Sequence, residues 1–173
     1  MKFFCLSALI AGLLFACGTN SSASELRIAL APKVGFPKDS PVFTEDATNF
    51  YGTNIVLLTS KLLRGRAEAQ LRRSIPASLR VEASRVANTS IISVVASGAD
   101  DSVGAPFLSA LFDQFIRFKR EQKEKYYRDA IITVDAALSS VPSEYTPRLQ
   151  IHREQLVIVS LLDVKPDFER IEY

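Results

Sequence analysis

Hydrophobic and polar residues follow two periods along the chain, one typical of strands and one typical of helices. Apolar residues alternate with polar or small ones over residues 25–32, 78–86 and 89–96, and this period of two predicts β-strands. In the third segment both alternating faces are largely apolar, which predicts a central strand covered by helices on both faces. Over residues 48–73 the apolar positions recur at helical spacings, which predicts one or two amphipathic helices.

The longest predicted element is a helix in the second half of the chain. A wide apolar stripe begins at Phe107, an almost entirely charged stretch follows, and no helix breaker interrupts the sequence before Ser140. A continuous helix of this length would measure about 50 Å, so part of it must project from the core or be supported by neighbours. Residues 147–163 predict a helix that returns antiparallel to it, and residues 167–173 predict a short final strand.

Together these elements predict an α/β fold of the α+β kind. We expect a small sheet with packed helices and one long projecting helix that forms a hairpin with the C-terminal helix. The expected organisation is a leader over residues 1–17, a flexible tether over residues 18–24 and a single α/β domain over residues 25–173.

The joint between the third predicted strand and the long helix is where a ligand-binding loop would be expected. Gly98 lacks the further glycines of a dinucleotide fingerprint and the lysine of a phosphate loop, so we interpret it as permitting a tight strand-to-helix turn. Asp100, Asp101 or Ser102 can cap the helix. Pro106 is tolerated in a first turn, because its missing amide hydrogen would be unpaired there.

The charge of the chain does not indicate a polyanionic partner. The sequence holds 21 basic and 19 acidic residues, a formal net charge of +2, and without Lys2 of the leader the balance is 20 to 19, or +1. A nearly neutral protein has no general attraction for nucleic acid, so we expect no nucleic-acid partner.

Few residues offer catalytic or metal-binding chemistry. His152 is the one histidine, and a catalytic base or metal ligand would need partners of its own kind. We therefore interpret it as an exposed residue on a helix face. The sequence also lacks a phosphate loop and a nucleophile elbow. We expect no catalytic residue, no metal site and no cofactor.

Basic residues cluster at one place, in the segment LLRGRAEAQLRRS. The cluster could contact phosphate or an acidic sugar, although charged residues are also common on any solvated helix face. Its members are Arg64, Arg66, Arg72 and Arg73.

The first seventeen residues have the pattern of a processing signal. Lys2 is followed by an apolar run over residues 3–15, which is shorter than the about 20 residues needed to span a bilayer. The segment LFAC, which ends at Cys17, resembles the lipobox of bacterial lipoproteins, in which the cysteine is lipidated and becomes the new amino terminus. An ordinary secretory signal cleaved nearby is the alternative.

The resemblance to lipoproteins implies a lipid anchor at the periplasmic face of a bacterial membrane. Gly18 stands where an aspartate would signal retention in the inner membrane, so the outer membrane is favoured. The small polar residues 18–24 suit a flexible tether. Cys5 would leave with the leader and Cys17 would be acylated, so we expect neither a free thiol nor a disulfide in the mature chain.

Three further segments carry a resemblance that extends from Asn54 to Gln122. They are NIVLLTSKLLRGRAEAQL, SRVANTSIISVVASGAD and APFLSALFDQFIRFKREQ. In order, they are similar to the first helix, the central strand and the following helix in the periplasmic domain of the polysaccharide co-polymerases, or chain-length determinant proteins. The resemblance is one of pattern, because this family has no short invariant signature and no catalytic residues.

The resemblance implies a small α/β base near the membrane, a long projecting helix, ring-like homo-oligomers and control of polysaccharide length together with a membrane polymerase. Members of the family have transmembrane helices at both ends of this domain. This sequence instead has a lipobox-like segment at one end and reaches Tyr173 without an apolar span. Because of this difference, we extend the expected role to a later export step.

We therefore expect a non-enzymatic, lipid-anchored periplasmic protein. It would assist exopolysaccharide assembly, chain-length control or export through homo-oligomerisation and contact with polymerase or export proteins. The alternative is a lipoprotein that itself binds acidic polysaccharide or peptidoglycan through the arginine cluster.

Overall fold

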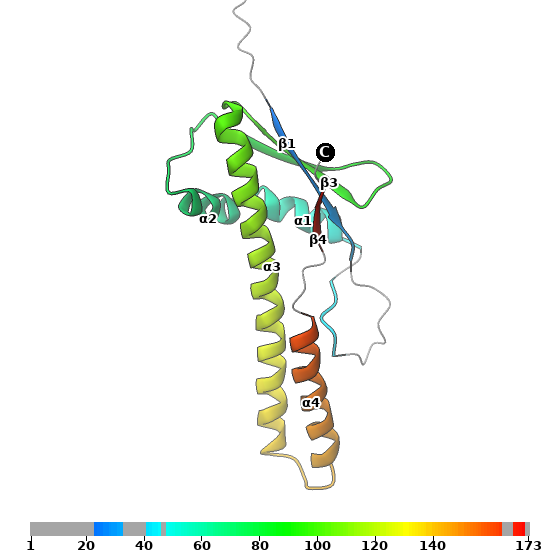
Figure 1. Ribbon diagram of the computed structural model, residues 1–173. Coiled ribbons are helices and arrows are strands. Elements are labelled where there is room, and N and C mark those ends of the chain that lie inside the picture. The colour runs from blue at the N-terminus through cyan, green and yellow to red at the C-terminus, as the bar shows by residue number, and fades with distance from the viewer. Residues whose placement is uncertain (1–22, 33–40, 46–47, 164–167, 172–173) are drawn as a thin grey trace, which may run out of the picture.

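The computed structural model describes residues 23–32, 41–45, 48–163 and 168–171. The strands form one antiparallel sheet in the order β2-β3-β1-β4, and the hairpin of α3 and α4 extends away from this sheet (Figure 1). This arrangement confirms the predicted α+β fold. The elements are β1 (Ser24–Leu30), α1 (Phe50–Leu58), α2 (Lys61–Leu71), β2 (Arg80–Arg85), β3 (Ile91–Ser97), α3 (Asp101–Leu138), α4 (Thr146–Leu162) and β4 (Phe168–Ile171).

One face of the sheet is buried and the other is only partly covered. In the register of β1 and β3, Ile28 stands opposite Ile92, so their side chains share a face. The predicted burial of both faces of β3 is wrong, because its other residues are half-buried. An antiparallel sheet needs apolar cover on one side only. The fully buried residues of the two strands are Leu26, Ile28, Leu30, Ile92, Val94 and Ala96.

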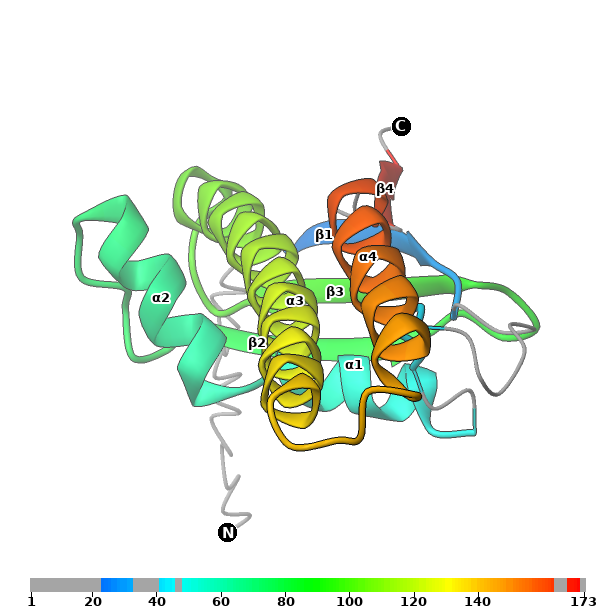
Figure 2. The same ribbon diagram turned by 90° about the horizontal axis from the view of Figure 1, so that it is seen from below.

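The long helix α3 passes through two environments. Its first part, including Phe107 and Phe115, packs into the main core with the sheet, α1 and α2. Its second part lies beside α4, and both helices project toward the viewer in Figure 2, in front of the strands. With 38 residues the helix measures about 57 Å. The expectation that part of it projects and is supported by a neighbour is confirmed.

The turn between β3 and α3 depends on Gly98. This residue has φ +84°, a backbone conformation that residues with side chains rarely adopt. A Cβ atom there would also lie 2.3 Å from the carbonyl oxygen of Ser78. The interpretation of Gly98 as the residue of a tight strand-to-helix turn is therefore confirmed.

The start of α3 differs from the expected capping. Asp100 occupies the N-cap position, but its side chain makes no capping hydrogen bond. The neighbouring Asp101 instead accepts a hydrogen bond of 2.9 Å from the hydroxyl of Ser24. This bond holds the start of β1 against the start of α3, at the end of the molecule opposite the turn of the hairpin (Figure 1).

Pro106 lies deeper in α3 than expected. The helix begins at Asp101, so Pro106 is its sixth residue and belongs to the second turn. Without an amide hydrogen, it leaves the carbonyl of Ser102 without its usual helical donor. The guanidinium of Arg73 donates to that carbonyl at 3.2 Å and replaces the missing bond.

Candidate functional site

The returning helix α4 carries apolar residues on two sides. Its inner side, with Leu156 fully buried, packs against α3. At 3.6 residues per turn, Ile158 lies about 160° around the helix from Leu156, and 55% of its surface is exposed. We call the exposed apolar residues of this outer side the outer stripe, and it consists of Ile151, Ile158, Leu161 and Leu162.

The outer stripe is unusually exposed for large aliphatic residues. Leu161 and Leu162 are 73% and 74% exposed, and Ile151 is 57% exposed. Exposed polar residues, Glu154 and Gln155, lie on the same side of the helix between Ile151 and Ile158. The continuous apolar part of the outer stripe is therefore formed by Ile158, Leu161 and Leu162, and an exposed apolar patch is typical of a protein contact surface.

A buried polar network closes the base of the hairpin, where α4 ends. The Tyr127 hydroxyl of α3 donates to Asp163 Oδ2 at 2.7 Å and accepts from the amide of Phe43 at 2.9 Å. Lys123 Nζ lies 3.4 Å from the other carboxylate oxygen of Asp163. The network therefore joins α3, the end of α4 and the segment 41–45, which are far apart in the sequence.

The same segment makes two further contacts with α3. The ring of Phe43 packs edge-on against Tyr126, with centroids 5.2 Å apart, and Glu45 forms an ion pair with the buried ammonium of Lys119. Burial in this region raises the pKa of the Tyr127 hydroxyl above its usual range, and the nearby Asp163 carboxylate adds to the effect.

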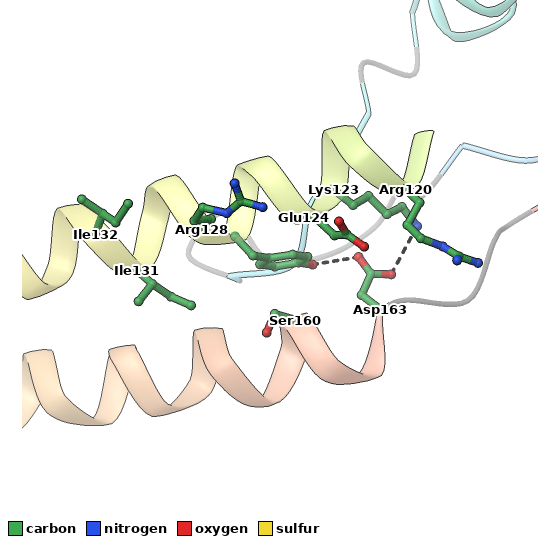
Figure 3. A pocket seen from close by; sticks show the side chains of 9 residues that line it. Arg120, Lys123, Glu124, Arg128, Ile131, Ile132, Ser160 and Asp163 are labelled. Carbon is green, nitrogen blue, oxygen red and sulfur yellow. Dashed lines mark hydrogen bonds and ion pairs between the residues drawn. The ribbon is translucent and has the colours of Figure 1, made fainter. Parts of the chain in front are cut away.

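A cavity of about 310 Å³ opens beside this network, between α3 and α4. Figure 3 shows the side chains of Arg120, Glu124 and Arg128 along α3, with Ser160 on α4 and Asp163 directly after that helix. Ile131 and Ile132 line the part of the cavity farther from the sheet. The cavity thus combines an apolar part with charged groups.

Two of the four predicted arginines, both on α2, bind other residues of the protein. Arg64 donates to Glu68 at 3.0 Å and to the carbonyl of Leu79 at 3.1 Å. Arg66 donates to Glu121 at 2.8 Å, and its guanidinium lies 5.5 Å from the ring centre of Phe118. The guanidinium groups of Arg64 and Arg66 therefore bind different parts of the protein.

The other two predicted arginines lie at the end of α2. Arg72 is the C-cap residue, with φ +51°, and is exposed. Arg73 supports the carbonyl of Ser102. Three of the four arginines therefore have separate structural contacts, and the structure does not bring the four together around one site.

The remaining predicted positions fall in three places. His152 lies on α4 and is half-buried, so its expected exposure is wrong. The described residues contain no group of three or more His, Cys, Asp or Glu side chains that could hold a metal ion. No helix in the described part of the chain is long and apolar enough to cross a membrane. Cys17 and the tether before residue 23 lie outside the described residues.

The sequence reasoning did not identify the outer stripe or the Tyr127 network. A signal for the stripe exists, since Ile151, Ile158 and Leu162 recur at spacings of seven and four on a helix that also carries an inner apolar face. The network had no comparable signal, because its partners are separated by 36 and 84 residues.

Comparison of the chain with protein-family models, with curated proteins and with solved structures finds no match.

Proposed function

We propose that this chain is a non-enzymatic, lipid-anchored periplasmic protein that works through self-association and contact with other proteins during exopolysaccharide assembly, chain-length control or export. The observation that carries the proposal is the outer stripe of α4, on a helical hairpin that projects from a small sheet. The described part of the chain leaves these large aliphatic side chains exposed. Their burial by another protein would be favourable by up to about 1.5–3 kcal/mol each.

The direction of the hairpin agrees with an anchored scaffold. Ser24 is bonded to the first turn of α3, whereas the turn between α3 and α4 lies at the other end of the molecule (Figure 1). A chain held through the residues before Ser24 would present the hairpin away from its anchor. Copies anchored in one membrane would project their outer stripes in the same direction.

The lipid anchor and the polysaccharide rest on sequence patterns. The lipobox-like segment that ends at Cys17 supports acylation, and the three segments between Asn54 and Gln122 resemble chain-length determinant proteins. The resemblance also supports a membrane polymerase or an export protein as the partner. The arginine cluster gives the polysaccharide-binding alternative less support, because three of its members have intramolecular partners.

Deletion of the gene, followed by size separation of the cell's polysaccharide, tests the proposal. We expect a changed amount or length distribution that the wild-type gene restores and Ile158→Glu does not. Gln122→Glu, which adds the same charge at an exposed position of α3, should restore it. A deletion strain with unchanged polysaccharide amount and length would overturn the proposed role.

Mass spectrometry of the mature amino terminus tests the anchor separately. We expect an acylated cysteine derived from Cys17. An unmodified amino terminus at another position would indicate an ordinary secretory signal and would remove the lipid anchor from the proposal.

A further inference from the structure

The cavity between α3 and α4 has features of a ligand site that the proposed scaffold role does not use. Its volume of about 310 Å³ is at the lower end of the range for small-molecule sites. It lies at the base of the hairpin, where the buried Tyr127 and Asp163 are held in place by their mutual hydrogen bond. Part of its wall is therefore formed before any ligand binds.

The charges around the cavity leave one positive charge in excess. Lys123 and Asp163 form an ion pair with each other. The remaining charged groups are Arg120, Glu124 and Arg128, which follow one another at intervals of four on α3. Neither arginine forms an ion pair with another residue in the described part of the chain. Their donors remain available to an anionic group.

The apolar part of the cavity lies next to these charges. Ile131 and Ile132 belong to the turn of α3 that follows Arg128, and the side chain of Tyr127 lines the cavity as well. Ile132 is 59% exposed, so a ligand that covered it would remove apolar surface from water. An apolar surface beside the guanidinium of Arg128 complements a molecule with one apolar and one anionic end.

We propose that this cavity binds an amphipathic anion, with a carboxylate or phosphate group at Arg128 and a short hydrocarbon body against Ile131 and Ile132. The cavity would recognise the combination of an anionic end and an apolar end in one molecule. A carboxylate and a phosphate monoester share the oxygen acceptors that guanidinium groups bind, so the test compares both.

The probes are octanoate and octyl phosphate, added to the purified full chain with methyl-labelled isoleucine. We expect both to shift the methyl signals of Ile131 and Ile132 but not that of Ile151, with a dissociation constant of about 1 mM or tighter. A stronger effect of octyl phosphate would identify a phosphate headgroup, and a stronger effect of octanoate a carboxylate. Either result supports the proposal.

Two variants test the two ends of the ligand separately. Arg128→Gln and Ile132→Asn should each weaken binding about tenfold, and both positions are exposed enough to tolerate substitution. Arg148→Gln, at an exposed position near the start of α4, should leave binding unchanged.

Three results would overturn the proposal. They are the absence of shifts at 10-fold the expected dissociation constant, equal binding of octyltrimethylammonium or inorganic phosphate, and unchanged binding by the Arg128 and Ile132 variants. None of these results depends on the polysaccharide phenotype, so failure of this inference and failure of the proposed function are distinguishable.

Discussion

Individual residues determine how the chain turns from the sheet into the long helix. Gly98 has φ +84°, and a side chain there would meet the Ser78 carbonyl at 2.3 Å. The sequence identified this glycine because it stands alone between a strand pattern and a helix pattern. The contact with Ser78 could not be predicted, since it comes from a segment twenty residues earlier.

We predict that Gly98→Ala lowers the free energy of unfolding by at least about 2 kcal/mol, because it combines a strained φ with a steric conflict. Urea unfolding of the purified protein measures the change. Gly65→Ala is the matched control, because Gly65 lies within α2 with no atom near its missing Cβ. It should raise stability by about 0.5–1 kcal/mol. Equal changes in the free energy of unfolding for the two substitutions would contradict the requirement for glycine at position 98.

Tyr127 and Tyr126 are neighbours in sequence but differ in environment. Tyr127 is 3% exposed and bonded at its hydroxyl to Asp163 and Phe43, whereas Tyr126 is 41% exposed. We predict that Tyr127→Phe lowers the free energy of unfolding by about 1–3 kcal/mol, because the buried Asp163 carboxylate loses a donor and the Phe43 amide loses its acceptor. Tyr126→Phe should change it by less than about 0.5 kcal/mol. Urea unfolding compares the pair, and similar losses would show that the network does not stabilise the hairpin.

The raised pKa of Tyr127 predicts a dependence on pH at the alkaline end. Its usual pKa is about 10, so above that pH the unfolded chain loses a proton that the folded chain retains. The unfolded state then binds fewer protons, and stability falls as pH rises, by up to about 1.4 kcal/mol per pH unit. Stability should therefore decline more steeply above pH 10 in the wild type than in Tyr127→Phe, measured by urea unfolding between pH 8 and 11. Parallel profiles of stability against pH for the two proteins would contradict a raised pKa of Tyr127.

At the scale of elements, the amphipathic pattern predicted the hairpin but not its second surface. The stripe from Phe107 to Phe118 correctly predicted the part of α3 that enters the core. The helix begins at Asp101, in agreement with the cap expected at Asp100, Asp101 or Ser102, and it ends at Leu138, two residues before Ser140. Helix ends depend on local contacts that periodicity does not define. On α4 the pattern predicts a helix, but only the position of α3 shows which apolar side remains uncovered.

We predict that the outer stripe drives association of the full chain. Ile158→Glu and Leu162→Glu should each shift the purified, detergent-solubilised protein toward smaller species in analytical ultracentrifugation, because a charge cannot enter an apolar contact without a partner. Their stability should remain close to that of the wild type, since both side chains are largely exposed.

The control for this experiment is Gln122→Glu, at an exposed position of α3. It should leave the size distribution unchanged. If the wild type and the stripe variants sediment identically over the same concentration range, self-association through α4 is excluded.

At the scale of the molecule, the hairpin is packed against many more buried apolar residues at the end near the sheet than at its distal end. Among the described residues, the main core contains 18 buried apolar residues from the sheet, α1, α2, α3 and the connection between α2 and β2, whereas the buried residues of the distal cluster are Tyr127, Val134 and Leu156. Regions with few buried apolar contacts open at lower free energy than the core. The distal hairpin is therefore expected to open at lower free energy than the main core.

Native-state hydrogen exchange should report this difference. We predict that the amides of α4 and of residues 128–138 exchange at lower protection than those of residues 107–115, which lie in the main core. Addition of a protein that covers the outer stripe should raise the protection of α4 selectively. Uniform protection along α3 would show that the hairpin and the sheet unfold as one unit.

The sequence by itself determined the order and type of the elements, the presence of one long helix and the turn at Gly98, because these depend on local periodicity and backbone preference. Only the tertiary structure decided which face of the sheet is covered, how Tyr127 meets Asp163 and Phe43, and where the arginines point. These features join residues distant in sequence, and their partners depend on how the helices pack against the sheet. The outer stripe depends on both the sequence and the tertiary structure. The spacing of its residues is visible in the sequence, and its exposure follows from the packing of α4 on α3.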